Sequence, residues 1–259
     1  MHLLLTNDDG YQADGLAALW AAAAPWGRIT VVAPRDGQSG QGHSVTTTDP
    51  ITVELIDDPR LGPTYVCDGT PADCVRLALT ELVTSPIDWV LAGINHGANL
   101  GMDVYYSGTI AAVREAAILG CRTVALSQFI DPALTTDWEQ AARLAGPVLG
   151  QLLGRSGAAP PIWNLNLPRS SAAAPRVHVV PLSADPLPVR FERSDADDHG
   201  PVEYRYCGVY TRRQATPGTD VATVFDNDIA VTPMTLEGTE PSGLAGGAAD
   251  GKRRIKPPS

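Results

Sequence analysis

The chain has 259 residues, of which 44% are hydrophobic, and its 29 acidic and 19 basic residues give a formal net charge of -10. This length can bury the core of one large α/β domain with a smaller appendage. The acidic balance argues against a nucleic-acid duplex or an anionic membrane as the main partner, because both attract basic surfaces.

The first half of the chain alternates apolar runs typical of buried strands with amphipathic helical segments. A capping hydroxyl at Thr70, a proline at position 71 and an acid at Asp73 predict a helix start. Strands separated by helices imply a mostly parallel, doubly wound α/β sheet of the Rossmann-like type. The expected strands are residues 3–6, 28–34, 52–57, 65–67, 89–94, 123–127, 162–167 and 177–182, and the expected helices are 15–24, 71–83, 109–119 and 138–153.

The pattern changes after residue 182. Residues 183–201 show no periodicity, whereas 203–210 and 221–233 resemble strands that have no core of their own. We therefore expect a catalytic core over 1–182, a C-terminal β arm over 183–239 and a disordered tail over 240–259. The arm is more consistent with an oligomerisation element than with a second domain.

The cysteines and the lysines restrict the chemistry. Cys67, Cys74, Cys121 and Cys207 have no C-x-x-C spacing and are expected to be free thiols. With no leader-like start and no long apolar run, a cytoplasmic location is expected. The only two lysines lie in the last eight residues, so a lysine-based phosphate cradle is not expected.

Three loops that follow predicted core strands carry oxygen ligands. The first holds Asp8 and Asp9, the second holds Ser39, and the third begins at Asn95. Parallel strands place these loops at one edge of the sheet, where open α/β proteins bind their ligands. Two carboxylates, a hydroxyl and an amide suit one hard divalent cation, Mg²⁺ or Mn²⁺, and suit zinc poorly. An Asp-Asp-Gly sequence alone would more often be a simple turn.

The turn Ser107, Gly108 and Thr109 opens a predicted helix. Free N–H groups and the positive end of the helix dipole make such a turn suitable for phosphate, although Ser and Thr are also ordinary helix caps. His43 lies in a glycine-rich loop and is a candidate acid or base, although a loop histidine is more often solvated or structural than catalytic. The glycine-rich loops lack the G-x-G-x-x-G order of a dinucleotide site, so no organic cofactor is expected.

Together these segments resemble the SurE-type nucleotidases, the stationary-phase survival proteins. The resemblance covers most of residues 1–168 in register, weakens, and returns at 216–233. The segments that carry it are LLLTNDDG, APRDGQSGQGHSVT, CDGTPADCV, AGINHGANLGMDVYYSGTIAAVREAAILG, NLNLP and PGTDVATVFDNDIAVTP.

This resemblance implies a metal-dependent phosphatase for nucleoside 5'- and 3'-monophosphates, with short polyphosphate as a secondary substrate. It places the metal ligands at Asp8, Asp9, Ser39 and Asn95, of which Asp8, Asp9 and Asn95 are also catalytic, and the phosphate-binding turn at residues 107–109. It also implies a dimer or tetramer that exchanges C-terminal arms.

Two alternatives stay open from the sequence. A non-hydrolytic sensor that binds metal and nucleotide would have the same ligands, and the phosphate could be attacked either by water or by Asp8 through an aspartyl-phosphate. The sequence departs from the family pattern at Met102 and Ala116, neither of which is an expected ligand. Residues 183–215 are little like the family, so the preference for base and sugar does not follow from the resemblance.

Overall fold

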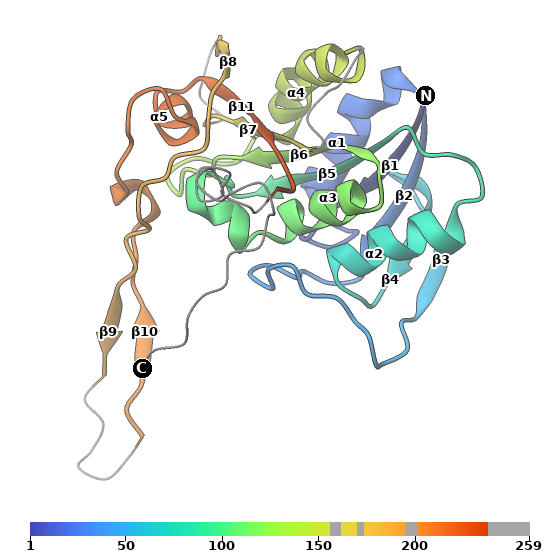
Figure 1. Ribbon diagram of the computed structural model, residues 1–259, viewed down its shortest axis with the longest axis horizontal. Helices are drawn as coiled ribbons and strands as arrows, with labels where there is room; N and C mark the ends of the chain where they lie inside the picture. Colours follow the sequence, from blue (N-terminus) through green and yellow to red (C-terminus); the bar gives the residue numbers. More distant parts are fainter. Residues whose placement is uncertain (156–161, 170–173, 195–200, 238–259) are drawn as a thin grey trace, which may run out of the picture.

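The computed structural model describes residues 1–155, 162–169, 174–194 and 201–237, and most of them surround one large sheet (Figure 1). This nine-stranded sheet has the order β3-β4-β2-β1-β5-β6-β7-β11-β8. Its strands are β1 His2–Thr6, β2 Arg28–Pro34, β3 Val53–Asp58, β4 Gly62–Cys67, β5 Trp89–His96, β6 Arg122–Gln128, β7 Ile162–Leu167, β8 Val177–Val179 and β11 Ile229–Met234.

Six neighbouring strands of the sheet, from β4 to β7, run parallel to one another, which confirms the expected doubly wound class. Among the described strands of this sheet, the antiparallel pairs are β3 with β4 and β11 with β7. From β1 the chain proceeds to β2 and β4 on one side, then returns to β5, β6 and β7 on the other. The strand order thus reverses between β1 and β5, and sheets of this class bind ligands outside the carboxyl ends of the strands at such a point.

Helices cover both faces of the sheet (Figure 1). Leu3 and Leu5 of β1 pack in one core cluster with residues of α1 and α4, whereas Leu4 packs in the opposite cluster with residues of α2 and α3. Burial on both faces explains why β1 is apolar without alternation. The helices are α1 Asp14–Ala23, α2 Pro71–Leu77, α3 Gly108–Ile118, α4 Trp138–Leu153 and α5 Asp220–Phe225, with 3₁₀ helices at Ala24–Trp26, Gly101–Tyr105 and Tyr210–Arg212 and a π-helix at Ala78–Leu82.

The predicted helix start at Thr70 is confirmed. Thr70 Oγ1 accepts a hydrogen bond from the Asp73 N–H, and the Asp73 carboxylate accepts one from the Thr70 N–H. This reciprocal capping box satisfies two of the N–H groups that a helix leaves without partners. Asp73 also accepts from the N–H and the hydroxyl of Thr46, so the start of α2 holds the loop that follows β2.

The prediction of a C-terminal β arm over residues 183–239 is partly wrong. Residues 221–233 form most of α5 and β11, and β11 enters the main sheet between β7 and β8. Ile229 and Val231 pack in one core cluster and Ala230 in another, which a free arm could not achieve. A short apolar run does not by itself distinguish a core strand from an arm strand. Elements α5 and β11 of the expected arm therefore belong to the fold around the main sheet, and the predicted tail over 240–259 lies outside the described residues.

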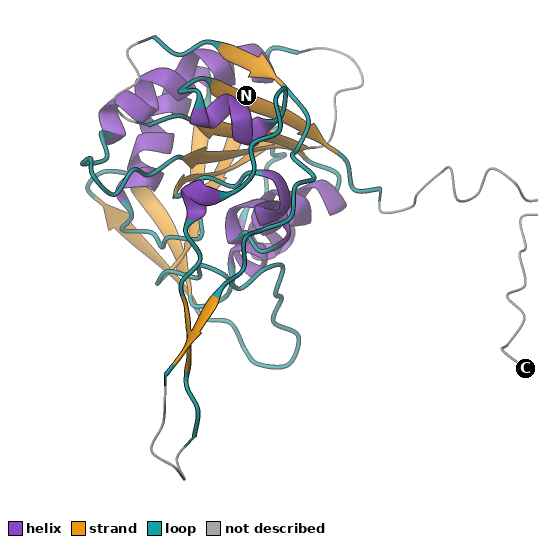
Figure 2. Ribbon diagram, turned by 90° about the vertical axis from the view of Figure 1, so that its left-hand side faces the viewer, coloured by secondary structure: helices purple, strands orange, loops and turns teal. Residues whose placement is uncertain are grey.

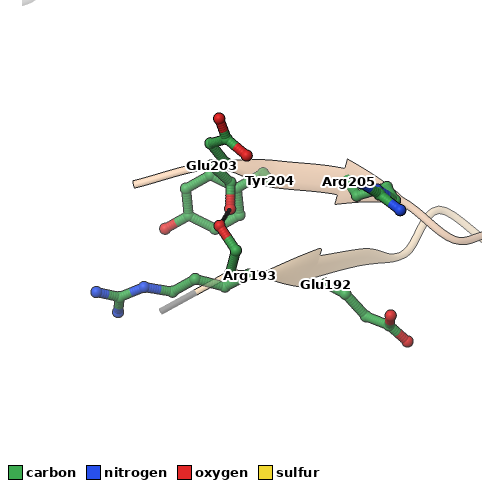
Figure 3. Close-up of a pocket in the computed structure, with 6 residues that line it drawn as sticks. Glu192, Arg193, Glu203, Tyr204 and Arg205 are labelled. Atoms are coloured by element: carbon green, nitrogen blue, oxygen red, sulfur yellow. Dashed lines mark hydrogen bonds between the residues drawn. The ribbon is translucent and has the colours of Figure 1, made fainter. Parts of the chain in front are cut away.

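The projecting part is a hairpin made of β9 Phe191–Arg193 and β10 Tyr204–Tyr206 (Figures 1 and 2). Its two strands pair antiparallel with each other and not with the main sheet. A hollow of about 540 Å³ lies along it, and its lining side chains come from both strands (Figure 3). None of the predicted site residues lines this hollow, so the chemistry expected from the sequence lies elsewhere.

Two further expectations concern the whole chain. All four cysteines are free, and Cys67 and Cys74 are buried, as expected for thiols without a metal or disulfide pattern. Among the helices of the described residues, none combines the length and apolar character that crossing a membrane requires.

Candidate active site

Asp8 lies just beyond the end of β1, and its carboxyl is buried against the start of α3. The Thr109 hydroxyl donates a hydrogen bond to Asp8 Oδ1 at 2.5 Å, and Asp8 is only 4% exposed. A Cβ at position 108 would lie 2.8 Å from Asp8 Oδ2, closer than real Cβ atoms approach, so this contact requires glycine there. The first strand end and the expected phosphate turn are therefore in direct contact.

Asp9 and Asn95 come from neighbouring strand ends. Asp9 Oδ2 accepts a hydrogen bond from the His96 N–H at 2.9 Å, which links the loop after β1 to the end of β5. Asn95 donates from Nδ2 to the Gly97 carbonyl at 2.7 Å, leaving the amide oxygen as the ligating end of the side chain. The register between β5 and β6 shifts between Ala92 and Asn95, and bulges of this kind redirect side chains next to functional sites.

Ser39 lies on the exposed part of the loop after β2. The preceding residue, Gln38, donates its N–H to the Asp8 carbonyl at 2.7 Å. Farther along the same loop, the Gly42 N–H donates to the Tyr106 carbonyl at 3.2 Å, beside the turn that opens α3. These backbone bonds bring the loop of Ser39 to the same edge as Asp8, Asn95 and the turn.

The turn at residues 107–109 uses its hydroxyl groups within the protein. Ser107 Oγ accepts from the Ile110 N–H and caps α3, while Thr109 holds Asp8. The first N–H groups of a helix have no acceptors within the helix, so they can donate to an anion. The carboxylate of Asp8 is the anion at this helix start in the structure, and the N–H of Thr109 contributes to its stabilisation.

Burial raises the pKa of the Asp8 carboxyl to about 6; the hydrogen bond from Thr109 opposes this shift, and the neighbouring charge of Asp9 adds to it. The two carboxylates are thus close enough to repel each other. A nearby cation favours the charged form of a carboxyl and would relieve this repulsion.

The donor set fits a hard cation. Within the described ranges no three His, Cys, Asp or Glu side chains converge on one point, so a metal here depends on two carboxylates together with neutral oxygens. The oxygens of Asp8, Asp9, Ser39 and Asn95 are of the kind that Mg²⁺ and Mn²⁺ prefer. So few protein ligands leave coordination positions for water and substrate.

His43 is held beside the turn by a buried carboxylate that sequence reasoning missed. Its Nε2 lies 2.8 Å from Glu115 Oε2, and Arg76 Nε donates to Glu115 Oε1 at 2.6 Å. Glu115 is 3% exposed on α3. A carboxylate bonded to one ring nitrogen fixes the orientation of an imidazole. The segment AAVREAA gives no local signal that Glu115 faces His43 rather than solvent.

A second missed interaction supports the loop between Asn95 and the turn. Arg213 makes two hydrogen bonds to the Asp103 carboxylate, at 2.7 and 2.8 Å, and its side chain is 5% exposed. The Tyr210 hydroxyl lies 2.8 Å from the same carboxylate. Tyr210 and Arg213 lie at the base of the hairpin, the segment that follows β10. They therefore fix the 3₁₀ helix Gly101–Tyr105, which leads to Ser107.

Fold and site together define a class: a doubly wound α/β protein with an acidic, oxygen-rich site and a helix start at the carboxyl edge of its parallel strands. Residues 3–185 match the family model described as survival protein SurE. The chain belongs to the SurE family.

Known relatives and a solved structure are similar to this protein over nearly the whole chain. A protein of Nostoc sp. is 43% identical over 91% of this chain and 100% of its own length. A protein of Rhodopirellula baltica named 5'-nucleotidase SurE is 37% identical over 90% of this chain and 92% of its own length. The crystal structure of the SurE protein from Aquifex aeolicus is similar, with a TM-score of 0.80 and 33% identity, over 95% of this chain and 97% of that one.

Proposed function

We propose that this protein is a divalent-metal-dependent phosphomonoesterase that hydrolyses nucleoside 5'- and 3'-monophosphates, with short polyphosphate as a secondary substrate. The observation that carries the proposal is the contact of Asp8 with Gly108 and Thr109, because it joins the candidate metal ligands to the helix start suited to phosphate. Relatives of this chain that are named 5'-nucleotidase support the hydrolysis of 5'-monophosphates.

In this proposal Asp8, Asp9, Ser39 and Asn95 hold one Mg²⁺ or Mn²⁺. When bound, such a cation supplies Lewis-acid polarisation of the phosphate and lowers the pKa of water. Thr109 fixes the Asp8 carboxylate, and the N–H groups at the start of α3 donate to the phosphoryl oxygens as their charge redistributes. His43, oriented by Glu115, is the candidate that moves a proton to or from the reacting oxygens.

Two nucleophiles are consistent with this arrangement. Water can attack phosphorus in line and displace the nucleoside oxygen, or Asp8 can form an aspartyl-phosphate that water then hydrolyses. A single turnover in ¹⁸O-labelled water excludes direct attack if label enters Asp8, whereas hydrolysis of the aspartyl-phosphate at phosphorus labels the released phosphate just as direct attack does. Direct attack places the label only in the released phosphate, whereas hydrolysis of an acyl phosphate at carbon leaves label in the Asp8 carboxylate.

The direct test of function is release of phosphate from p-nitrophenyl phosphate and from AMP with Mn²⁺, with and without a chelator. We expect turnover that the chelator abolishes and that added metal restores. Binding of AMP without any release of phosphate, across a panel of divalent metals, would refute the enzyme and favour the sensor. A dinucleotide-dependent dehydrogenase would instead bind nicotinamide, so fluorescence titration with NADH tests that function, and no binding is expected.

We further propose that the protein assembles as a homodimer or homotetramer through the hairpin. Three of its large apolar side chains are more than half exposed, Phe191 at 56%, Tyr204 at 64% and Tyr206 at 58%. Exposed apolar patches of this kind mark interaction sites. Four free thiols fit a reducing compartment, which supports the cytoplasmic location expected from the sequence.

A further inference from the structure

We propose that an apolar cavity beside the candidate active site binds the nucleobase of the substrate; this inference rests on the proposed function. The cavity has a volume of about 260 Å³. Its lining residues are Gly97, Ala98, Phe129, Ile130, Pro132, Val209, Tyr210 and Thr211. They come from the loops after β5 and β6 and from the base of the hairpin.

The position of the cavity connects it to the phosphate chemistry. Gly97, one of its walls, accepts the hydrogen bond from the Asn95 side chain at 2.7 Å. Two residues of extended chain span at most about 7 Å, so the cavity begins within the length of a nucleotide from Asn95. A ligand with its phosphate at Asp8, Asn95 and the turn can therefore place its other end here.

The lining determines the chemical class of the occupant. None of the lining side chains is charged, which disfavours a polyphosphate chain or a second phosphate. A ribose would need polar partners for each hydroxyl, because unpaired polar groups are costly to bury. A flat, neutral, aromatic ring suits walls that include Phe129 and Tyr210. The volume lies below the ~300 Å³ at which pockets for larger ligands begin, so the cavity takes a ring system and not a whole nucleotide.

The aromatic walls are held in place by contacts within the protein. The Tyr210 hydroxyl lies 3.1 Å from the Ala98 carbonyl and 2.8 Å from the Asp103 carboxylate, and the Arg213 guanidinium lies 4.3 Å from the centre of the Tyr210 ring. Phe129 is 2% exposed, and its ring packs edge-on against Phe225 at 5.5 Å. Preorganised walls reduce the entropy that binding would otherwise cost.

The test separates the base from the phosphate. We expect wild-type protein with saturating Mn²⁺ to hydrolyse AMP with a KM about tenfold below that for ribose 5-phosphate, which lacks the base. In the double variant Val209→Ala, Ile130→Ala the KM for AMP should rise about tenfold with kcat unchanged, as expected when contacts shared by ground and transition states are lost. The constants for ribose 5-phosphate should not change. Leu134→Ala, a 42% exposed residue outside the lining, is the matched control and should behave as wild type.

Adenosine binding, measured by calorimetry, provides a readout that does not depend on hydrolysis. Wild-type protein should bind adenosine, and the double variant should bind it about tenfold more weakly. Equal KM values for AMP and ribose 5-phosphate, or an unchanged KM for AMP in the double variant, would overturn the nucleobase site while the phosphatase remained. If neither ester is hydrolysed, the proposed function fails. The nucleobase site then holds only if wild-type protein binds adenosine and the double variant binds it more weakly. Any other calorimetric result overturns the nucleobase site.

Discussion

Asp8 combines burial, a neighbouring charge and a helix start in one residue. Its carboxyl is 4% exposed, and its pKa is raised to about 6, mainly by burial, with the Thr109 hydrogen bond acting in the opposite direction. A carboxylate that is poorly solvated and repelled by Asp9 is favourably placed to bind a cation. The adjacent Asn7 also supports a cation site here, because its amide oxygen is buried with no hydrogen-bond partner among the described residues.

At the residue scale, replacing Asp9 with Asn tests the metal site. The variant keeps the shape of the side chain and removes one of the two charges that would hold the cation. We expect kcat/KM for AMP to fall at least ~100-fold. Replacing a residue that only hydrogen-bonds to a metal ligand typically costs up to ~100-fold, and a direct ligand should cost no less. The measurement is AMP hydrolysis over a Mn²⁺ titration. Asp36→Asn, an exposed residue in a loop at the same edge, is the control, and full activity of Asp9→Asn at saturating metal would contradict the ligand assignment.

At the scale of elements, the base of the hairpin is coupled to the loop that leads to α3. Arg213 and Asp103 form a bidentate pair between the residue after one 3₁₀ helix and the middle of another, and Gly101 donates its N–H to Asp220 of α5 at 2.7 Å. The loop between β5 and α3 is thus held by residues more than 100 positions away along the chain. The position of Ser107 therefore depends on the C-terminal part of the fold.

Breaking this pair should destabilise the protein. Arg213→Met leaves the Asp103 carboxylate without its cation, and we expect the free energy of unfolding to fall by about 3 kcal/mol. The double variant Asp103→Asn, Arg213→Met should lose less than the two single variants together, because it leaves no unpaired charge. Denaturant unfolding measures all three variants. Losses that simply add would show that the two side chains act independently.

A charged cluster beside the paired strands β8 and β11 predicts that the stability of the protein depends on pH. Asp228 accepts the Arg176 N–H at 2.9 Å and lies 2.8 Å from His178 Nε2. The backbone hydrogen bond from Arg176 is the main reason that the pKa of the Asp228 carboxyl is lowered, and the hydrogen bonds from the His178 and Arg176 side chains lower it further. A lowered pKa stabilises the folded state above the unfolded-state pKa of about 3.9, and this contribution is lost as the pH falls through the folded-state pKa.

Asp228→Asn should therefore cost about 1–2 kcal/mol of stability at neutral pH, because it removes a charged acceptor from several hydrogen bonds. Thermal unfolding from pH 7 to pH 3 should show a constant difference from wild type down to pH ~5 that shrinks below pH ~4. Asp226→Asn, an exposed residue in the same turn, is the matched control. A difference that stayed constant to pH 3 would show that the charge of Asp228 does not contribute.

At the scale of the whole molecule, the hairpin projects away from the sheet and its helices (Figure 2), and every residue of β9 and β10 is exposed. Within the hairpin, the rings of Phe191 and Tyr206 pack against each other at 5.5 Å in an edge-on arrangement. A two-stranded hairpin is marginally stable alone in water, so burial of these rings against another subunit would stabilise it. The candidate active site, by contrast, lies at the sheet edge within one chain.

Replacing both Phe191 and Tyr206 with Ser should therefore shift the protein towards the monomer, as measured by light scattering over a range of concentrations. Activity per subunit should be retained, since both side chains are exposed on the projecting hairpin (Figure 1). Leu55→Ser, an exposed residue on β3 with a similar exposed fraction of 58%, controls for a general loss of surface apolarity. Unchanged assembly in the hairpin variant would exclude this surface as the oligomer interface.

The layers of the fold and the place of the site follow from the amino-acid pattern alone. Apolar runs such as residues 3–6 and 89–94 alternate with helical segments, which requires a parallel sheet, and the carboxyl ends of parallel strands meet at one edge. This pattern is sufficient to group Asp8, Asp9 and Asn95. The helix starts at Thr70 and Ser107 are also predictable, because a capping residue acts on its own next few N–H groups.

How these parts meet depends on tertiary packing. The bond from Thr109 to Asp8 joins residues 101 positions apart, and that from Arg213 to Asp103 joins residues 110 positions apart. The same holds for β11, whose short apolar run forms a core strand because β7 and β8 provide its partners. Periodicity and capping report interactions within a few residues, whereas contacts between distant segments depend on how the whole chain packs and leave no local pattern in the sequence.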